Sequence, residues 1–223
     1  MSTDVQAAFG AGRDGYPDVP VPRSAKGGRR RLSIMAAAAK LFRERGFANT
    51  TTDAIGEACG VSGPAIYHHF KNGKQQILAE LIWEIGDELR QAVGKVSNAS
   101  LSPYEQLELF LRAEAGAIHA NPDIFPLIFT EDRYLRPEDL PVTLERRRYF
   151  IALRASLIRA VRPDLDHQEL STMSVTVQFV LGGTTFNMQD PDTGRVQEQT
   201  VQMALALVRS TPAGAPSPQA SAR

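Results

Sequence analysis

The chain has 223 residues, 43% of them hydrophobic and 22% charged, which is the composition of an ordinary soluble globular protein. Its single cysteine excludes a disulfide framework and a zinc site built from several thiolates, and fits a reducing cytoplasm. The sequence contains no stretch of roughly 18 uninterrupted apolar residues and no pattern of an export signal at its start, so we expect a cytoplasmic protein.

The net charge of zero conceals an uneven distribution along the chain. Between positions 23 and 74 there are ten basic and three acidic side chains, a net charge of +7, whereas residues 75–223 have a net charge of −5. A compact basic segment joined to a mildly acidic body is typical of a module for a polyanion attached to a domain with another task.

The two ends of the chain differ in composition from its middle. Residues 1–28 and 211–223 are rich in Gly, Pro, Ser and other small or polar residues, so we expect a disordered arm and a disordered tail. Between them the apolar residues recur with helical spacing, and runs of alternating β-branched residues bounded by hairpin turns are absent from the sequence. The expected fold class is therefore all-α.

The basic segment begins with a helix predicted over residues 29–45, where four apolar side chains form one stripe. Gly46 ends this helix, and a short second helix is predicted over residues 53–59, after several side chains suited to an N-cap. Gly60 provides the turn into a third helix, which carries Pro64 in its first turn.

The third helix has two different faces. Ile66 and Phe70 lie four residues apart and are predicted to face the core. The residues on the other face must then point outward, namely Pro64, Ala65, Tyr67 and His68. A short helix, a glycine turn and a second helix with an exposed polar face form the pattern of a helix-turn-helix, whose second helix lies in the DNA major groove.

The same stretch resembles a known family. Residues 31–78 include the run AAAAKLFRERGFANTTTDAIGEACGVSGPAIYHHFKNGKQQIL and are similar to the DNA-binding domain of the TetR/AcrR family of bacterial transcriptional regulators. Gly73 departs from this pattern, since many members have no residue between the Phe-x-Asn run and the lysine. The resemblance implies a DNA-binding domain over residues 29–74 and a ligand-binding and dimerisation domain over residues 75–210.

The expected phosphate contacts follow from the resemblance, and the expected contacts with bases and with the minor groove follow from the size and charge of the residues. Phosphates are expected to be bound by Thr51, Thr52, Tyr67, His68 and Lys74. Base edges are expected to be approached by the small residues Gly63, Pro64 and Ala65. The flanking minor groove is the expected place of Arg29, Arg30 and Arg31. The alternative for Tyr67 and His68 is a solvated helix face, and the alternative for the arginines is a solvated charge run.

The rest of the chain is predicted to form further helices, over residues 74–96, 103–120, 137–161, 167–187 and 197–210. Residues 175–186 are apolar on more than one face, which indicates that a second subunit covers part of this helix. The family resemblance implies dimerisation through the last two helices, which sets two recognition helices roughly 34 to 36 Å apart on a palindromic operator.

A ligand cavity in the body is a further implication of the resemblance. Its expected lining consists of Trp83, Phe110, Ile118, Phe125, Phe129, Tyr134 and Phe179, although each of these also fits an ordinary core. The expected ligand is largely apolar, such as a fatty-acyl or acyl-CoA compound. Its anionic part is expected to be held by arginines drawn from Arg133, Arg146, Arg147, Arg148, Arg154 and Arg159, for which a solvated helix face is the alternative.

These observations favour a ligand-responsive repressor, released from its operator by the ligand and needing no cofactor. The sequence argues against an enzyme, because GVSGP lacks the Gly-x-Ser-x-Gly spacing and the histidines at 68, 69, 119 and 167 share no metal-binding spacing. The remaining alternative is a helix-turn-helix module that binds a protein in place of DNA, which the salt dependence of binding would distinguish.

Overall fold

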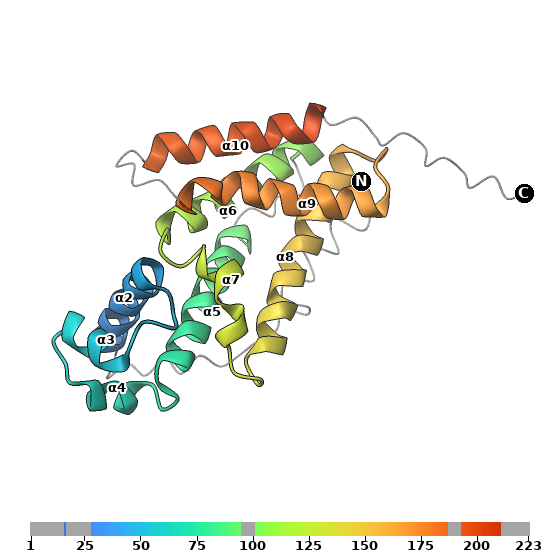
Figure 1. The fold of residues 1–223 in the computed structure, drawn as a ribbon. Helices are drawn as coiled ribbons and strands as arrows, with labels where there is room; N and C mark the ends of the chain where they lie inside the picture. Colours follow the sequence, from blue (N-terminus) through green and yellow to red (C-terminus); the bar gives the residue numbers. More distant parts are fainter. Residues whose placement is uncertain (1–15, 17–27, 95–100, 187–192, 211–223) are drawn as a thin grey trace, which may run out of the picture. The chain divides into compact units, whose positions relative to one another are not determined.

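The computed structural model of the protein describes Tyr16 and residues 28–94, 101–186 and 193–210, where its regular elements are all helical (Figure 1). The all-α prediction is confirmed. The chain divides into two compact units, which we describe separately: one contains residues 16–90 and 117–147, and the other contains the remainder. The predicted arm and tail lie outside the described residues, apart from Tyr16 and Gly28, and the domain boundary predicted at residue 74 stays a prediction.

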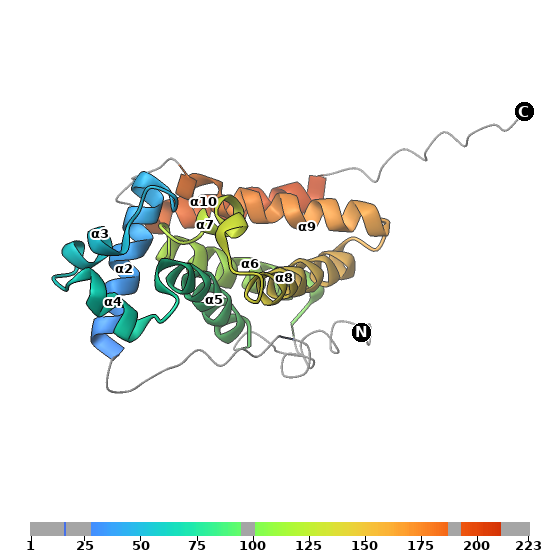
Figure 2. The same cartoon turned by 60° about the horizontal axis from the view of Figure 1, so that its bottom comes forward.

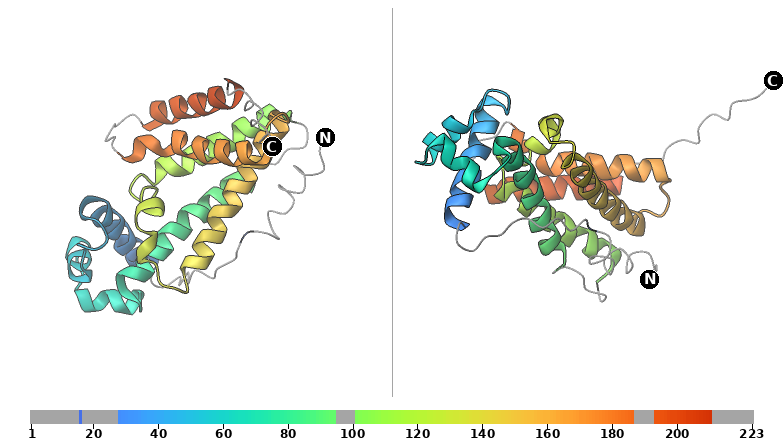
Figure 3. Two further views of the ribbon diagram at one scale, coloured as in Figure 1. Left: turned by 45° about the vertical axis from the view of Figure 1, so that its right-hand side comes forward. Right: turned by 90° about the horizontal axis from the view of Figure 1, so that it is seen from below.

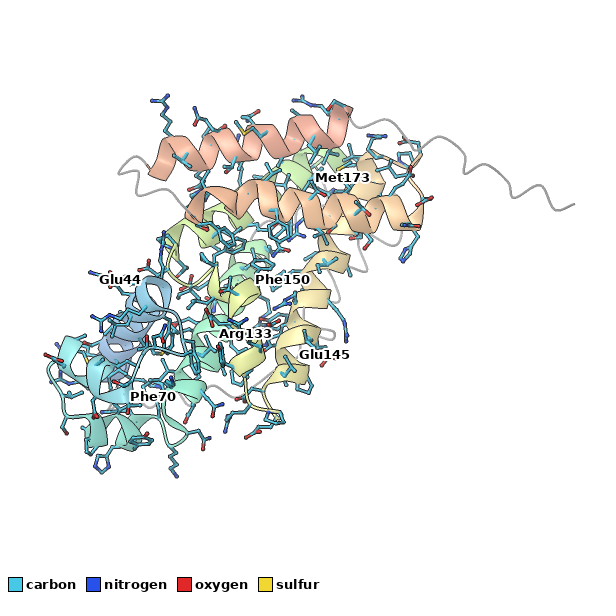
Figure 4. The ribbon with its side chains drawn as sticks, viewed as in Figure 1. Glu44, Phe70, Arg133, Glu145, Phe150 and Met173 are labelled. Carbon is cyan, nitrogen blue, oxygen red and sulfur yellow. The ribbon has the colours of Figure 1, made fainter. Side chains whose placement is uncertain are left out.

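Three helices form the N-terminal head of the first unit. They are α2 (Gly28–Arg45), α3 (Thr52–Ala58) and α4 (Gly63–His69), and α3 packs against both of the others (Figures 1 and 2). Their shared core consists of side chains that are at most 1% exposed, namely Ile34, Phe42, Ile55, Ile66 and Phe70. Figure 4 labels Phe70 among the side chains of this head. The predicted inward face of the third helix is thus confirmed.

Two glycines end helices of the head in the conformation that the sequence suggested. Gly46 has φ 76° after α2 and Gly60 has φ 70° after α3, and both values lie in the left-handed region that residues with a Cβ rarely adopt. Gly73, the departure from the family pattern, has φ 58° and begins the next helix, α5 (Gly73–Gly94). The additional residue is therefore the first residue of α5.

The first unit also contains the segment that follows α6 (Pro103–Ala120). It comprises α7 (Leu127–Thr130), the 3-10 turn η1 (Asp132–Tyr134) and the start of α8 (Leu140–Val161). We predicted α8 to begin at residue 137, but it begins at Leu140, after Arg136 and Asp139 pair side chain to side chain at 2.6 Å. The Trp83 indole of α5 donates to Thr143 Oγ1 of α8 at 2.9 Å, which ties these two helices together.

The second unit is built on α9 (His167–Gly182) and α10 (Thr193–Ser210), which run side by side in opposite directions (Figures 1 and 3). A capping box starts α9, because Asp166 accepts from the Glu169 amide while Glu169 accepts from the Asp166 amide. We predicted α9 to continue to residue 187, but its last turn is the 3-10 turn η2 (Gly183–Phe186).

Each helix within the described ranges is either too short or too polar to cross a lipid bilayer.

Candidate DNA-binding site

A close approach of two backbones fixes the angle between α3 and α4. A Cβ added to Gly56 would lie 2.7 Å from the carbonyl oxygen of Val61, and one added to Gly63 would lie 1.7 Å from Asp53 Oδ1. Both glycines are buried. Gly56 has no room for a methyl group, because the atom that it would meet belongs to the backbone, and a methyl group at Gly63 would require Asp53 to move.

The outer face of α4 presents the residues that the sequence predicted. Tyr67 is 50% exposed, and Pro64 and His68 are also exposed, while Ala65 is partly exposed. The tyrosine ring lies against the first residue of α5, since a Cβ at Gly73 would meet Tyr67 Cε1 at 3.1 Å. The predicted outward direction of these side chains is confirmed, and the face carries polar and small residues.

The N-terminus of α3 is open to solvent on the same head. Thr51 is the N-cap, is exposed, and accepts a hydrogen bond from the Ala54 amide at its Oγ1 at 3.1 Å. Thr52 follows it and is partly exposed. Free amides and the positive end of the helix dipole favour an anion at this place, as a DNA phosphate contact requires.

Gly63 does not lie where the sequence suggested. We expected it to approach base edges, but it is buried against Asp53 of α3 and serves the contact between helices. Its small size is needed for the fold of the head, so the expected approach to bases is left to Pro64 and Ala65.

The ammonium group of Lys74 is also engaged within the protein. Its Nζ donates to the carbonyl oxygens of Phe47 at 2.8 Å, Thr50 at 2.7 Å and Ala48 at 3.4 Å. It also lies 4.4 Å from the centroid of the Phe47 ring, and burial lowers the pKa of Lys74 from its ordinary value. Three carbonyl oxygens match the three donors of an ammonium group, so this lysine is not presented to a phosphate as we expected.

The three arginines at the start of α2 have different surroundings. Arg31 ion-pairs with Glu80, donates to the carbonyl of His69 and lies 3.9 Å from the centroid of the Phe70 ring. Because its side chain is only 13% exposed, the placement of Arg31 does not support its expected role in the minor groove. Arg29 and Arg30 are exposed, and Arg30 donates to the carbonyl of Cys59 at 3.2 Å.

The structure does not bring the expected ligand-lining residues together in one unit. Phe110 and Phe179 belong to the second unit and the others to the first. Phe179 is 44% exposed, so it does not line an interior as we expected. Arg133 is exposed, and Tyr134 stacks on Phe47 of the head, with ring centroids 4.8 Å apart. The other members of the first unit, Trp83, Ile118, Phe125 and Phe129, are buried or partly buried.

Three of the arginines expected to hold an anion are paired with protein groups. Arg146 lies 3.4 Å from Asp87, Arg147 lies 3.4 Å from Asp132, and the fully buried Arg154 pairs with Glu114. Their expected role as ligand contacts is therefore not supported by their placement. The remaining three, Arg133, Arg148 and Arg159, are exposed.

The sequence did not predict that Tyr16 is buried, because this residue lies in a stretch whose composition predicts disorder. In the structure it is 7% exposed, and its ring lies 4.7 Å from the Arg146 guanidinium and 5.2 Å from that of Arg90. Burial raises the pKa of Tyr16 well above its ordinary range, with a further contribution from Asp87. The sequence offers no local signal for this contact.

Among the described residues, no group of three or more His, Cys, Asp or Glu side chains is placed to hold a metal ion.

The geometry of the site is that of a small helical head with one face and one helix N-terminus directed outward, and this arrangement suits a duplex.

Comparisons with known proteins agree with that geometry. Residues 34–81 match the model of the family described as bacterial regulatory proteins, tetR family. The HTH-type transcriptional repressor KstR2 of Mycolicibacterium smegmatis is 26% identical over 204 residues, which cover 86% of this chain and 93% of KstR2. Residues 34–81 are thus the DNA-binding domain of a TetR-family transcriptional regulator.

Solved structures show the same fold. The TetR-family regulator PfmR of Thermus thermophilus aligns with a TM-score of 0.66 and 26% identity, over 78% of this chain and 96% of PfmR. AibR, solved with isovaleryl coenzyme A and operator DNA, aligns with a TM-score of 0.63 and 18% identity, over 78% of this chain and 97% of AibR.

Proposed function

We propose that this regulator binds a palindromic operator as a homodimer, represses the genes behind it, and is released by a largely apolar small molecule. The proposal of DNA binding rests on the outer face of α4, which presents Pro64, Ala65, Tyr67 and His68. The open N-terminus of α3 lies on the same three-helix head. Affinity would come from phosphates and specificity from base edges.

The contacts divide by chemistry. Tyr67, His68, Thr51 and Thr52 are polar and exposed or partly exposed, which suits phosphate oxygens. The smaller side chains of Pro64 and Ala65 suit a close approach to bases, and the Ala65 methyl group suits the methyl group of thymine. In the flanking minor groove we retain only Arg29 and Arg30, because Arg31 is held inside the head.

The proposal of a dimer rests on apolar side chains that remain exposed on the last helices. Phe179 of α9 is 44% exposed, Phe186 of η2 is 37% exposed and Met203 of α10 is 62% exposed. Large apolar groups exposed on two adjacent helices and on the 3-10 turn that follows the first are what a second subunit would bury. A twofold dimer of this kind requires an operator with matching symmetry.

The repressing role and the ligand are supported by relatives alone. KstR2 is a repressor, and this chain spans most of its length. AibR binds isovaleryl coenzyme A and operator DNA in the same fold, so a fold of this type can hold a thioester, and a fatty-acyl or acyl-CoA ligand remains our proposal here. A coupling of about 1 to 3 kcal/mol between ligand and operator would change operator affinity roughly 5- to 150-fold.

The test is the binding of duplex DNA at increasing salt. The logarithm of the affinity should fall linearly with the logarithm of salt concentration, by about 0.9 for each neutralised phosphate. Tyr67→Ala should weaken binding to every sequence, while Tyr104→Ala, a change on α6 of the other unit, should not. An affinity insensitive to salt, or untouched by Tyr67→Ala, would favour a protein partner for the head.

A further inference from the structure

The loop between α2 and α3, residues 46–51, is held by groups from two other parts of the first unit. This loop ends at Thr51, the N-cap of α3, so its position decides where the helix N-terminus is presented. The buried Thr50 fixes its middle by donating to the carbonyl oxygens of Gly46 at 2.9 Å and Leu41 at 3.2 Å.

The first of these groups is the ammonium of Lys74 at the start of α5. By binding the carbonyls of Phe47, Ala48 and Thr50, it fixes the peptide that immediately precedes Thr51. A buried carbonyl without a donor is costly, and removing this lysine takes its donor from the carbonyl of the buried Thr50, whereas the Phe47 carbonyl still accepts from the Thr50 amide.

The second group is the ring of Tyr134 in η1. It stacks on Phe47 with an interplanar angle of 26°, and Phe47 is itself only 3% exposed. Gln75 of α5 donates to the Tyr134 carbonyl at 3.2 Å, so η1 is anchored beside Lys74. Arg43 near the end of α2 binds the segment before α7 through the Pro122 carbonyl at 2.7 Å and Asp123 at 3.0 Å.

We propose that Lys74 and Tyr134 are positioning residues for the phosphate-binding end of α3, acting through Phe47 and the loop that ends at Thr51. Neither contacts DNA in this role. The inference rests on the proposed function in that Thr51 and Thr52 are taken as phosphate contacts. Through these contacts the segment 122–134 touches the DNA-binding head directly. This connection is additional to the one that the chain itself makes where the head continues into α5.

The test uses the full chain with the variants Lys74→Met, Tyr134→Leu and their combination. Amide exchange of residues 51–55 is measured without DNA, and affinity is measured for a duplex of mixed sequence at several salt concentrations. Each single change should speed exchange in this stretch about 10-fold, since the helix end opens locally more often. It should also weaken duplex binding several-fold, while the dependence on salt keeps the wild-type slope because the number of neutralised phosphates is unchanged.

A double-mutant cycle and matched controls complete the experiment. The combined variant should lose less affinity than the product of the two single losses, because both residues act through the same loop. Lys71→Met, which removes an exposed lysine three positions earlier, should leave the exchange of residues 51–55 unchanged. Tyr134→Phe keeps the stacked ring and should behave as the wild type, which guards against a variant that merely fails to fold.

Two outcomes would overturn the proposal, and they differ from a failure of the proposed function. If Lys74→Met leaves exchange unchanged but lowers the salt slope by about 0.9, the lysine is a direct phosphate contact. If Tyr134→Leu alters neither exchange nor affinity, the ring does not position the loop. If the wild type ignores duplex DNA, the proposed function fails, while the exchange data still decide whether the two residues hold the loop.

Discussion

Arg154 of α8 and Glu114 of α6 form a salt bridge in which neither side chain reaches solvent, with Nε of the arginine 2.9 Å from Oε2 of the glutamate. A second bond joins Nη2 to the other carboxylate oxygen, so the pair is bidentate. Arg154 also donates to the Ser174 carbonyl at 2.9 Å and to its Oγ at 3.1 Å. The pair thereby links α6 and α8 to α9, the helix that carries the proposed dimer surface.

Breaking this pair from one side should be strongly destabilising. Arg154→Met leaves the Glu114 carboxylate buried without its counter-ion, and losses of about 3 to 5 kcal/mol are typical of such changes. We expect the midpoint of urea unfolding, followed by circular dichroism, to fall accordingly. Changing both residues to methionine should recover much of the loss, because an apolar pair of similar volume avoids the unpaired charge. Arg159→Met, at an exposed position on the same helix, is the matched control and should change the midpoint little.

The contact of Gly63 with Asp53 makes a second prediction. Gly63→Ala places a Cβ within 1.7 Å of Asp53 Oδ1 and 3.2 Å of Asp53 Cα, so both the side chain and the backbone of α3 must move. We expect a loss of about 1 to 3 kcal/mol in the stability of the head and a loss of duplex binding. Adding Asp53→Ala should restore part of both, since it removes the closest atoms. Gly28→Ala meets no atom within 4 Å and should leave stability at the wild-type level; an equal effect of both changes would exclude the steric explanation.

The helices of this chain could be predicted because their apolar residues repeat with a clear period. The predicted range 103–120 coincides with α6, and the turns at Gly46 and Gly60 lie where predicted, since local chemistry determines both. The outward face of α4 followed from the same reasoning. These features depend on residues close together in the sequence.

The candidate-site residues that the structure places differently make contacts with parts of the chain that lie far away in the sequence. Arg31 is held by Glu80, which is 49 residues away, and the acceptors of Lys74 are backbone carbonyls that a sequence does not display. Both residues carry charge in a basic segment, so composition alone could not separate an internal ion pair from a phosphate contact. Phe179 illustrates the same limit, because an apolar residue on a helix fits a cavity lining and a subunit surface equally well.

The capping box at the start of α6 predicts a specific pH response. Ser102 donates from both its hydroxyl and its backbone amide to Glu105 Oε2, at 2.7 Å each, and these bonds lower the pKa of Glu105. A carboxyl with a lowered pKa stabilises the folded state above its unfolded pKa, and this contribution is lost as pH falls through the folded value. Titration of Glu105 by NMR should therefore show a midpoint below its ordinary value of 4.5 in the wild type. Ser102→Ala, which removes the hydroxyl donor, should raise that midpoint, and an unchanged midpoint would show that the box does not form in solution.

The exposed apolar groups of α9 and α10 predict the oligomeric state and its consequence for DNA. Sedimentation of the wild type should give twice the chain mass of 24.4 kDa. Phe179→Glu or Met203→Glu places a charge on the proposed interface, where burial without a partner is costly, and should shift the protein toward the mass of one chain. Leu32→Glu is the matched control, since Leu32 is 55% exposed but lies on α2 of the other unit, and it should remain dimeric.

A monomeric variant keeps its head intact, so it should bind a single half-site as well as the wild-type head does. It should lose the gain in affinity that a palindrome gives two linked heads, because that gain depends on both half-sites being engaged by one dimer. If Phe179→Glu and Met203→Glu both remained dimeric with undiminished preference for a palindrome, the two subunits would have to meet through another surface.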